Sequence, residues 1–296
     1  MKSNLLFVIN PVAGSIDAAK VEHTARKFAE KFEFDIEFYF TTGAEDAKRI
    51  EEKLSSNTYH RVIVAGGDGT IAMVASQLLN KNIVLGILAC GSANGLLTSL
   101  EYPKTLPEQF EVAFAHYTQT IDALCVNDII CLHIADIGIN AELIYNYEKT
   151  NSRGMLGYAL HSLPTLFKSD YPYRFKIHLE DKVIESAGVL LAFANAKKYG
   201  TGANINPIGK IDDGFFEVIL YKRLSFWEIL KTFFNKTSKQ EPYIHRYHAA
   251  SVAVESKHPV ALQVDGEFIG KFETFSAYII PKCLPLALMD PAKKVI

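Results

Sequence analysis

A glycine-rich segment, Gly66-Gly67-Asp68-Gly69-Thr70, carries the clearest chemical signal in the sequence. It directly follows the apolar run 61–65 and precedes a helical pattern of apolar residues. Glycines allow a chain to turn tightly and to approach a phosphate group without a clash at Cβ. A helix that starts there adds free N–H groups and the positive end of its dipole. The segment therefore predicts a phosphate-binding loop, with an ordinary strand-to-helix turn as the alternative.

Two more loops of the same kind follow apolar runs. Gly91-Ser92-Ala93-Asn94-Gly95 comes after residues 83–88, and Asn10-Pro11-Val12-Ala13-Gly14-Ser15 comes after residues 4–9. Three such loops at the ends of three strands are far less expected by chance than one. The sequence has no Gly-x-x-x-x-Gly-Lys-Ser/Thr segment, which excludes a P-loop nucleotidase. No Gly-x-Gly-x-x-Gly follows the first apolar run, which argues against a Rossmann dehydrogenase.

The elements that must position these loops alternate in type over residues 1–125. Short apolar runs predict strands at 4–9, 35–40, 61–65 and 83–88. Between them, apolar residues fall on single helical faces: Val21, Ala25, Phe28 and Phe32, with Ser15 as a candidate cap, then Ala47, Ile50 and Leu54, then Ile71, Val74, Ala75, Leu78 and Leu79. This alternation predicts an open α/β sheet of parallel strands with crossover helices on both faces. Such sheets bind ligands where strand ends meet helix starts.

The pattern changes near residue 126. Runs rich in Val, Ile, Phe, Tyr and Thr predict strands at 128–137, 173–179, 183–194, 215–221, 251–254, 260–264 and 274–280. Turn signals such as Asp213-Gly214 and Asp265-Gly266 separate them, which indicates a mostly antiparallel β-sandwich or barrel. Residues 140–168 have a helical pattern, and residues 224–249 are polar, aromatic and basic. We expect an α/β domain at 1–125 and a β-rich domain at 126–296, with about the last 12 residues returning to the first domain.

Composition limits what the protein can be. At 296 residues the chain is long enough for two domains, and 49% apolar residues can supply two cores. Its 31 Lys and Arg against 33 Asp and Glu give no support for a nucleic-acid partner. No apolar run reaches the ~18–20 residues of a membrane-spanning helix, and the apolar start is too short for a signal peptide. Four cysteines and nine histidines show no metal-ligand spacing, so we expect reduced thiols, no zinc and a cytoplasmic protein.

The three loops together resemble the diacylglycerol kinase catalytic domain family, which includes bacterial soluble lipid kinases and sphingosine kinases and is related to NAD kinases and phosphofructokinases. Further matches follow in order along nearly the whole chain: Asp122, Gly138 with Ala141, Gly154-x-x-x-Tyr158, Asn195, Asp212-Asp213-Gly214 and Asp265-Gly266-Glu267. Each match is weak alone, but their order and spacing together are specific. The resemblance implies an NAD kinase-like first domain and a second domain that binds the phosphoryl acceptor.

In this family ATP lies over the glycine loop. The resemblance therefore implies that the nucleotide-binding residues are Asn10, Thr41, Gly66, Gly67, Asp68, Gly69, Thr70, Ile71, Ala72, Ser92 and Asn94. Ser92 stands where the family usually has Thr. Thr41 follows the second predicted strand, where the cap of a helix is the local alternative.

The same resemblance implies a set of catalytic carboxylates. Asp68 and Asp122 correspond to residues that hold Mg²⁺ through water. Asp265 corresponds to the general base that takes the proton of the acceptor hydroxyl, supported by Glu267. From local sequence alone, Asp122 is an ordinary strand-edge residue, and Asp265-Gly266 is the standard signal of a type I′ hairpin. A base on the second domain and ATP on the first would place the chemistry in the cleft between the domains.

A structural Mg²⁺ is also implied by the resemblance, in the turn before a predicted strand. In bacterial relatives this turn binds the ion, which here would use the Asp213 carboxylate and the main-chain carbonyls of Lys210 and Phe215. A turn without metal is the alternative, because one carboxylate and two carbonyls bind Mg²⁺ weakly. Two residues depart from the family: Gly95 replaces an Asp of the Mg²⁺ network, and Asn140 replaces a frequent Asp. Losing a carboxylate would weaken Mg²⁺ binding or slow the enzyme without removing nucleotide binding.

The resemblance predicts an ATP- and Mg²⁺-dependent lipid kinase that phosphorylates the hydroxyl of a diacylglycerol-like lipid at the membrane surface. The lipid would occupy apolar residues that are otherwise ordinary core, namely Leu143, Ile144, Met155, Leu156, Leu160, Leu163 and Leu166. Basic and aromatic residues within 222–248 suit transient contact with an anionic membrane, and a solvated surface is the alternative. The sequence is also compatible with a homodimer. The rival functions are a kinase for a soluble metabolite such as NAD and a nucleotide-binding regulatory protein without turnover, the latter motivated by Gly95.

Overall fold

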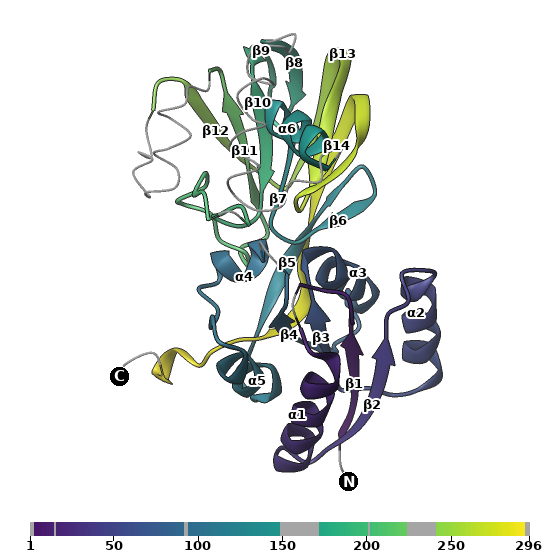
Figure 1. Cartoon of the computed structure of the whole chain (residues 1–296). Helices are drawn as coiled ribbons and strands as arrows, with labels where there is room; N and C mark the ends of the chain where they lie inside the picture. The colour runs from purple at the N-terminus through teal and green to yellow at the C-terminus, as the bar shows by residue number, and fades with distance from the viewer. Residues whose placement is uncertain are drawn as a thin grey trace. The chain divides into compact units, whose positions relative to one another are not determined.

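The computed structural model describes residues 3–14, 16–91, 94–148, 172–200, 202–223 and 241–293 (Figure 1). The chain folds into two compact units, one formed by residues 1–121 with 282–296 and the other by residues 122–281. The sequence pattern places this boundary between residues 125 and 126, with about the last 12 residues in the first domain. Strands β5 (Thr118–Val126) and β14 (Glu267–Ala287) each contribute residues to both units.

The first unit is a parallel α/β sheet. Strands β1 (Ser3–Ile9), β2 (Phe34–Phe40), β3 (Arg61–Gly66) and β4 (Val84–Ala89) pair in the order β4-β3-β1-β2, and the end of β14 pairs with β4. The helices are α1 (Ala18–Lys31), α2 (Asp46–Ser56), α3 (Asp68–Leu78), α4 (Gly95–Ser99) and α5 (Leu106–Phe114), with a 3-10 turn at Pro291–Lys293. The predicted parallel sheet is confirmed, and the bounds of each predicted strand agree to within one residue.

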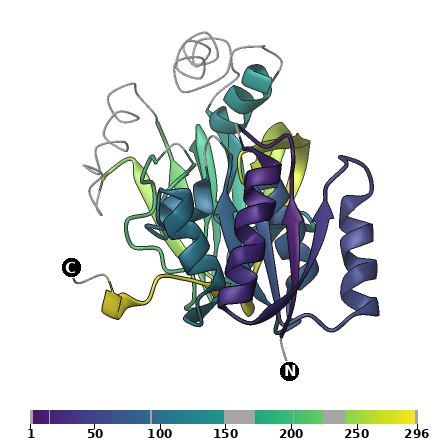
Figure 2. The same ribbon diagram turned by 60° about the horizontal axis from the view of Figure 1, so that its bottom comes forward.

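Helices α1 and α5 pack together over one face of this sheet, and α1 lies in front of the strands in Figure 2. The face is apolar because alternate residues of β1, including Leu5 and Phe7, point to it. They meet Val21 and Ala25 of α1 and Phe110 of α5. On α1, Asp17 is the N-cap and its carboxylate accepts a hydrogen bond from Lys20 N. The cap predicted at residue 15 lies outside the described residues.

The second unit is mostly antiparallel. Its further strands are β6 (Ile129–Cys131), β7 (Ile134–Gly138), β8 (Tyr173–His178), β9 (Val183–Gly188), β10 (Leu190–Ala194), β11 (Phe216–Tyr221), β12 (Ile244–Ala249) and β13 (Ser251–Val264), and helix α6 spans Ile139–Glu148. The strands pair in the order β12-β11-β10-β7-β13-β14, while β8 pairs with β13, β9 pairs with β8 and β6 pairs with β5. Residues of one face form a core cluster that includes Ile137, Phe193, Val218 and Leu262. The predicted β-sandwich class is confirmed.

Several predicted strands differ in extent from those observed. The runs 128–137 and 183–194 each form two strands, while 251–254 and 260–264 belong to the single strand β13. The residues between these two runs were not predicted as strand; they belong to β13, which shifts register between Glu255 and Val260 and leaves most of them exposed. The run 274–280 is the middle of β14. β12 falls in a stretch with no predicted strand, because its side chains between Ile244 and Ala249 are polar or aromatic.

Two predicted stretches extend beyond the described residues. Of 140–168, the structure describes helix α6, and of 224–249 it describes residues 241–249. The predictions at Gly154, Met155, Leu156, Tyr158, Leu160, Leu163 and Leu166, and most of those for the basic stretch, therefore lie outside the described residues. Within the part of the chain that is described, no helix has both the length and the apolar character needed to cross a membrane.

Candidate active site

The three predicted loops of the first unit lie against one another. They follow β1, β3 and β4, which are neighbours in a parallel sheet, so their C-terminal ends meet at one edge. Cys90 N donates to Gly66 O at 2.8 Å, and Asn10 N donates to Ala65 O at 2.9 Å. A Cβ on Gly91 would lie 2.8 Å from the Cα of Gly67, a distance that real Cβ atoms do not show. Glycine is therefore required where the second and third loops touch.

The start of α3 presents main-chain N–H groups at this edge. Asp68, Gly69 and Thr70 form the first turn, where N–H groups have no acceptor within the helix. The first amide bonded within the helix is that of Ile71, which donates to Gly67 O at 3.0 Å, and the Ile71 side chain is buried. The predicted phosphate cradle therefore fits the backbone of residues 67–70 rather than the side chain of Ile71.

Two polar contacts tie the first loop to α3. Asn10 Nδ2 donates to Thr70 Oγ1 at 2.9 Å, while Asn10 Oδ1 accepts from Val12 N at 3.1 Å. Asn10 thereby fixes both its own loop and the first turn of the helix. Its position agrees with the predicted nucleotide site, and its contact with a nucleotide stays a prediction.

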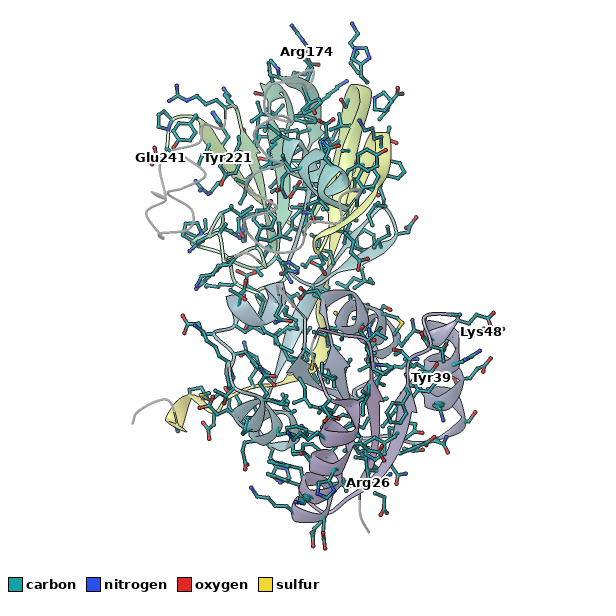
Figure 3. The ribbon with its side chains drawn as sticks, viewed as in Figure 1. Arg26, Tyr39, Lys48, Arg174, Tyr221 and Glu241 are labelled. Atoms are coloured by element: carbon teal, nitrogen blue, oxygen red, sulfur yellow. The ribbon has the colours of Figure 1, made fainter. Side chains whose placement is uncertain are left out.

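The loop after β2 is held by Asp46. Its carboxylate accepts from the Tyr39 hydroxyl at 2.6 Å, from Thr42 N at 2.9 Å and from Gly43 N at 2.7 Å (Tyr39 is labelled in Figure 3). Burial alone would raise the pKa of Asp46, but these donors outweigh it and hold the pKa below its ordinary value. Thr41 N donates to Ile9 O at 2.9 Å, and the N-cap of α2 is Glu45, so Thr41 does not cap that helix.

Gly95, where the resemblance implies an Asp, contacts one of the two predicted Mg²⁺ carboxylates, Asp68, through its backbone. Gly95 N donates to Asp68 Oδ1 at 2.9 Å, which joins the third loop to α3. Asn94 has a left-handed backbone (φ 55°), and its Nδ2 donates to Gly91 O at 2.9 Å. Its Oδ1 is buried and has no hydrogen-bond partner among the described residues. Ser92 lies outside those residues.

In the second unit, Asp265 and Gly266 form the two-residue turn between β13 and β14. Val264 pairs with Glu267 across it, and both turn residues have positive φ, 49° and 92°. Positive φ at both positions is the geometry of a type I′ turn, so the local prediction of a hairpin is confirmed. Glu267 is the first residue of β14 and is exposed. Its predicted support of Asp265 stays a prediction.

The Asp265 side chain is nevertheless buried, with 7% exposed, and it accepts many hydrogen bonds. Leu132 N donates to Oδ2 at 2.7 Å, and His133 N donates to Oδ1 at 3.0 Å. Burial would raise the pKa of Asp265, but the charge and hydrogen bond of the His133 imidazole and these amides lower it below its ordinary value. Asp265 is therefore a carboxylate at neutral pH, which is the form that can accept a proton.

Asp122 lies in the same unit and is fully buried. Its Oδ2 accepts from Gly214 N at 2.7 Å, and its own N–H donates to Ile211 O at 2.7 Å. Asn195 Nδ2 donates to Asp122 O at 3.1 Å and to Leu132 O at 3.5 Å. Because Leu132 N donates to Asp265 Oδ2, Asn195 and Leu132 connect the main-chain carbonyl of Asp122 to the carboxylate of Asp265.

The predicted structural metal turn is connected to Asp122 through Gly214. Asp213 Oδ1 accepts from Phe215 N at 3.2 Å, and the Phe215 ring stacks on His248 with 4.4 Å between centroids. No group of three His, Cys, Asp or Glu side chains that could hold a metal occurs within the described ranges. One carboxylate with the carbonyls of Lys210 and Phe215 fits only a weak Mg²⁺ site, so this ligand set stays a prediction.

Sequence reasoning missed a buried polar cluster that supports the Asp265 turn. Asp136 Oδ2 on β7 accepts from Tyr199 Oη and Gln263 Nε2 at 2.6 Å each and from Asn140 Nδ2 at 2.7 Å. Gln263 Oε1 in turn accepts from Gly266 N at 2.8 Å. The one sequence signal for this cluster is Asp136 itself, an acidic residue inside the otherwise apolar strand β7. Burial raises the pKa of Asp136 to about 6. Hydrogen bonds from Tyr199, Asn140 and Gln263 lower this pKa, but their effect is smaller than that of burial.

We expect the variant Asp136→Asn to be more stable than the parent at neutral pH. Since the folded-state pKa of Asp136 is raised from 3.8 to about 6, its contribution to stability is lost as pH rises through that interval. A shift of about two pKa units corresponds to about 3 kcal/mol. The side-chain amide of Asn accepts weaker hydrogen bonds than the carboxylate does, which reduces the expected gain in stability. Urea unfolding at pH 7.5 and pH 4 measures the change. A gain of about 1–3 kcal/mol at pH 7.5 that vanishes at pH 4 is expected, and a loss at both pH values would contradict it.

Comparison with known proteins agrees with this two-part structure. Residues 4–126 match the model of the diacylglycerol kinase catalytic domain, and residues 135–288 match that of the YegS C-terminal NAD kinase beta sandwich-like domain. The chain therefore belongs to the diacylglycerol kinase catalytic domain family, in the form that carries the YegS C-terminal domain.

Individual relatives cover most of the chain. It is 28% identical to the "Probable lipid kinase YegS-like" of Chromohalobacter salexigens, over 82% of this chain and 80% of that protein. It is 27% identical to the protein of the same name from Citrobacter koseri, over 81% of each chain. A crystal structure described as a diacylglycerol kinase from Bacillus anthracis superposes with a TM-score of 0.75 over 98% of both chains at 20% identity, which shows a shared fold.

Proposed function

We propose that this protein is a kinase that uses ATP and Mg²⁺ to phosphorylate the hydroxyl of a diacylglycerol-like lipid at a membrane surface. The observation that carries the proposal is the Asp265 carboxylate, which is ionised, buried and connected through Leu132 and Asn195 to the main chain of Asp122. Phosphoryl transfer to an alcohol needs such a group to accept the hydroxyl proton. The family match and the named lipid kinases among the relatives support the choice of reaction and acceptor.

The first unit supplies groups suited to a nucleotide. The first-turn N–H groups of α3 can donate to phosphate oxygens, and Gly67 and Gly91, which touch beside them, add no side chains to this edge. Asn94 Oδ1, buried and unpaired among the described residues, fits a hydrogen-bond donor such as a ribose hydroxyl or an amino group of a base. ATP would supply the phosphoryl group, and Mg²⁺ would offset its charge.

The division of roles follows from these groups. Asn10 and Asp68 hold the loops around the α3 N-terminus in one arrangement, which orients a bound phosphate chain. Asp68 and Asp122 remain the residues that we propose hold Mg²⁺ through water. Asp265 takes the proton of the acceptor hydroxyl. We further propose that the protein contacts the membrane only transiently, to reach its lipid.

The test is a transfer assay with γ-labelled ATP. Purified protein is incubated with Mg²⁺ and vesicles that contain diacylglycerol among other lipids, and labelled lipid is the expected product. Chelating Mg²⁺ with EDTA should remove the product. A parallel reaction with NAD in place of vesicles tests a soluble acceptor. Labelled NAD, or no transfer to any lipid of a broad panel, would overturn the proposal.

One observation favours a second candidate, a nucleotide-binding protein without turnover. The Gly95 amide binds Asp68 at a position where the resemblance implies another carboxylate, so the proposed Mg²⁺ network would have one acidic group fewer. Calorimetric titration with ATP and Mg²⁺ separates the two candidates. Binding of ATP without transfer to lipid would favour the second one, and transfer would exclude it.

A further inference from the structure

The imidazole of His133 contacts the carboxylate of Asp265. The Nδ1 atom of His133 lies 2.6 Å from Oδ1 of Asp265, and the exposed fractions of the two side chains are only 4% and 7%. His133 belongs to the two-residue link between β6 and β7, while Asp265 belongs to the turn between β13 and β14. The pairing of β7 with β13 brings these segments together from opposite ends of the second unit's sequence.

The chemistry of the contact fixes the state of the imidazole. Since Asp265 is ionised at neutral pH, both of its oxygens are hydrogen-bond acceptors. An unprotonated Nδ1 would place two lone pairs against each other at 2.6 Å inside a buried site, which is strongly unfavourable. Nδ1 must therefore carry a proton and donate it to Oδ1, whatever the state of the other ring nitrogen.

The two carboxylate oxygens of Asp265 consequently differ. Oδ1 accepts from His133 Nδ1 at 2.6 Å, His133 N at 3.0 Å, Cys131 Sγ at 3.1 Å and Ile134 N at 3.3 Å. Among the described residues, Oδ2 accepts only from Leu132 N, at 2.7 Å. An oxygen with two lone pairs is fully used by this many donors, so Oδ2 is the one with capacity for a further proton.

We propose that His133 is a positioning residue for the general base: its Nδ1–H anchors Oδ1 of Asp265 and so presents Oδ2 as the proton-accepting oxygen. The inference rests on the proposed function. In the transfer, the acceptor hydroxyl proton moves to Oδ2 as the hydroxyl oxygen bonds to phosphorus and the bond between phosphorus and the departing diphosphate breaks. The His133 proton stays on Nδ1 throughout, and no other reactant is needed.

Two substitutions of His133 separate anchoring from mere space filling. Asn places an amide N–H near the position of Nδ1, so His133→Asn keeps the donor, whereas His133→Ala removes it. We expect His133→Ala to lower kcat about 10- to 100-fold with little change in the KM for ATP, and His133→Asn to recover most of that loss. The control is His178→Ala, because Nε2 of His178 also lies close to a carboxylate, that of Glu255 at 2.9 Å, but in a half-exposed pair. It should behave like the parent.

A readout independent of turnover tests the contact itself. In protein labelled with ¹⁵N-histidine, the Nδ1–H of His133 should give a low-field proton resonance that disappears in His133→Ala and shifts in Asp265→Asn. Thermal unfolding of each variant checks that it is folded. Absence of that resonance, or a folded His133→Asn as slow as His133→Ala, overturns the proposal. If the parent transfers phosphate to no acceptor, the proposed function fails, while the resonance still decides whether His133 anchors Oδ1.

Discussion

Asp265→Asn is expected to lower kcat for lipid phosphorylation by about 10²–10⁴-fold and to leave the KM for ATP nearly unchanged. An amide cannot accept the hydroxyl proton, and the residue lies in the second unit, apart in the chain from the glycine loops of the first. In the Asn variant, an NH₂ group must also take the place of a carboxylate oxygen that accepts hydrogen bonds from N–H groups. Placing Nδ2 against Leu132 N sets two donors face to face, so we expect a loss of about 1–3 kcal/mol in the free energy of unfolding.

The matched control for this prediction is Asp181→Asn. Asp181 also follows a strand at a hairpin of the second unit, between β8 and β9, but 75% of its side chain is exposed. Both variants lose one carboxylate, so any general effect of charge appears in both. Kinetics at saturating lipid, with urea unfolding of each protein, measures the outcome. An Asp265→Asn enzyme within threefold of the Asp181→Asn enzyme would exclude Asp265 as the base.

Periodicity in the sequence was sufficient to predict the fold class. Buried parallel strands such as β3 are continuous apolar runs, and their helices carry apolar residues on one face, so the elements and their succession along the chain could be read directly. The antiparallel unit was harder. Its strands expose many polar side chains, so residues 255–259 within β13 had no strand pattern, and β12 was missed altogether.

The candidate site shows a different limit. The Asp265-Gly266 turn was predictable because positive φ at two successive residues favours these residue types. The burial of the Asp265 side chain was not, since the amides that bind it come from residues 132–134, more than 130 positions earlier in the chain. His133, Asp136 and Gln263 are likewise brought together by pairing of β7 with β13. No local pattern encodes a contact across such a separation.

Gly14→Ala is expected to destabilise the first unit and to weaken nucleotide binding together. Gly14 has φ +58°, and a Cβ there would lie 2.1 Å from the carbonyl oxygen of Cys90, which is backbone of the neighbouring loop. Relief of that overlap must push the first and third loops apart. Backbone strain and overpacking together predict a loss of about 2–5 kcal/mol in the free energy of unfolding. The displaced loops should raise the Kd for ATP at least about tenfold, because phosphate recognition by backbone groups tolerates little movement.

Gly43→Ala separates the overlap from the backbone strain. Gly43 lies in the same unit and has a similar positive φ of +83°, but a Cβ there would meet no atom within 4 Å. Its cost should therefore be the left-handed strain alone, about 1–2 kcal/mol. Urea unfolding gives the two stabilities, and their difference measures the contact between the loops. Equal losses in the two variants would show that the loop after β1 can move away from Cys90 freely. The arrangement of the glycine loops would then not be fixed before a nucleotide binds.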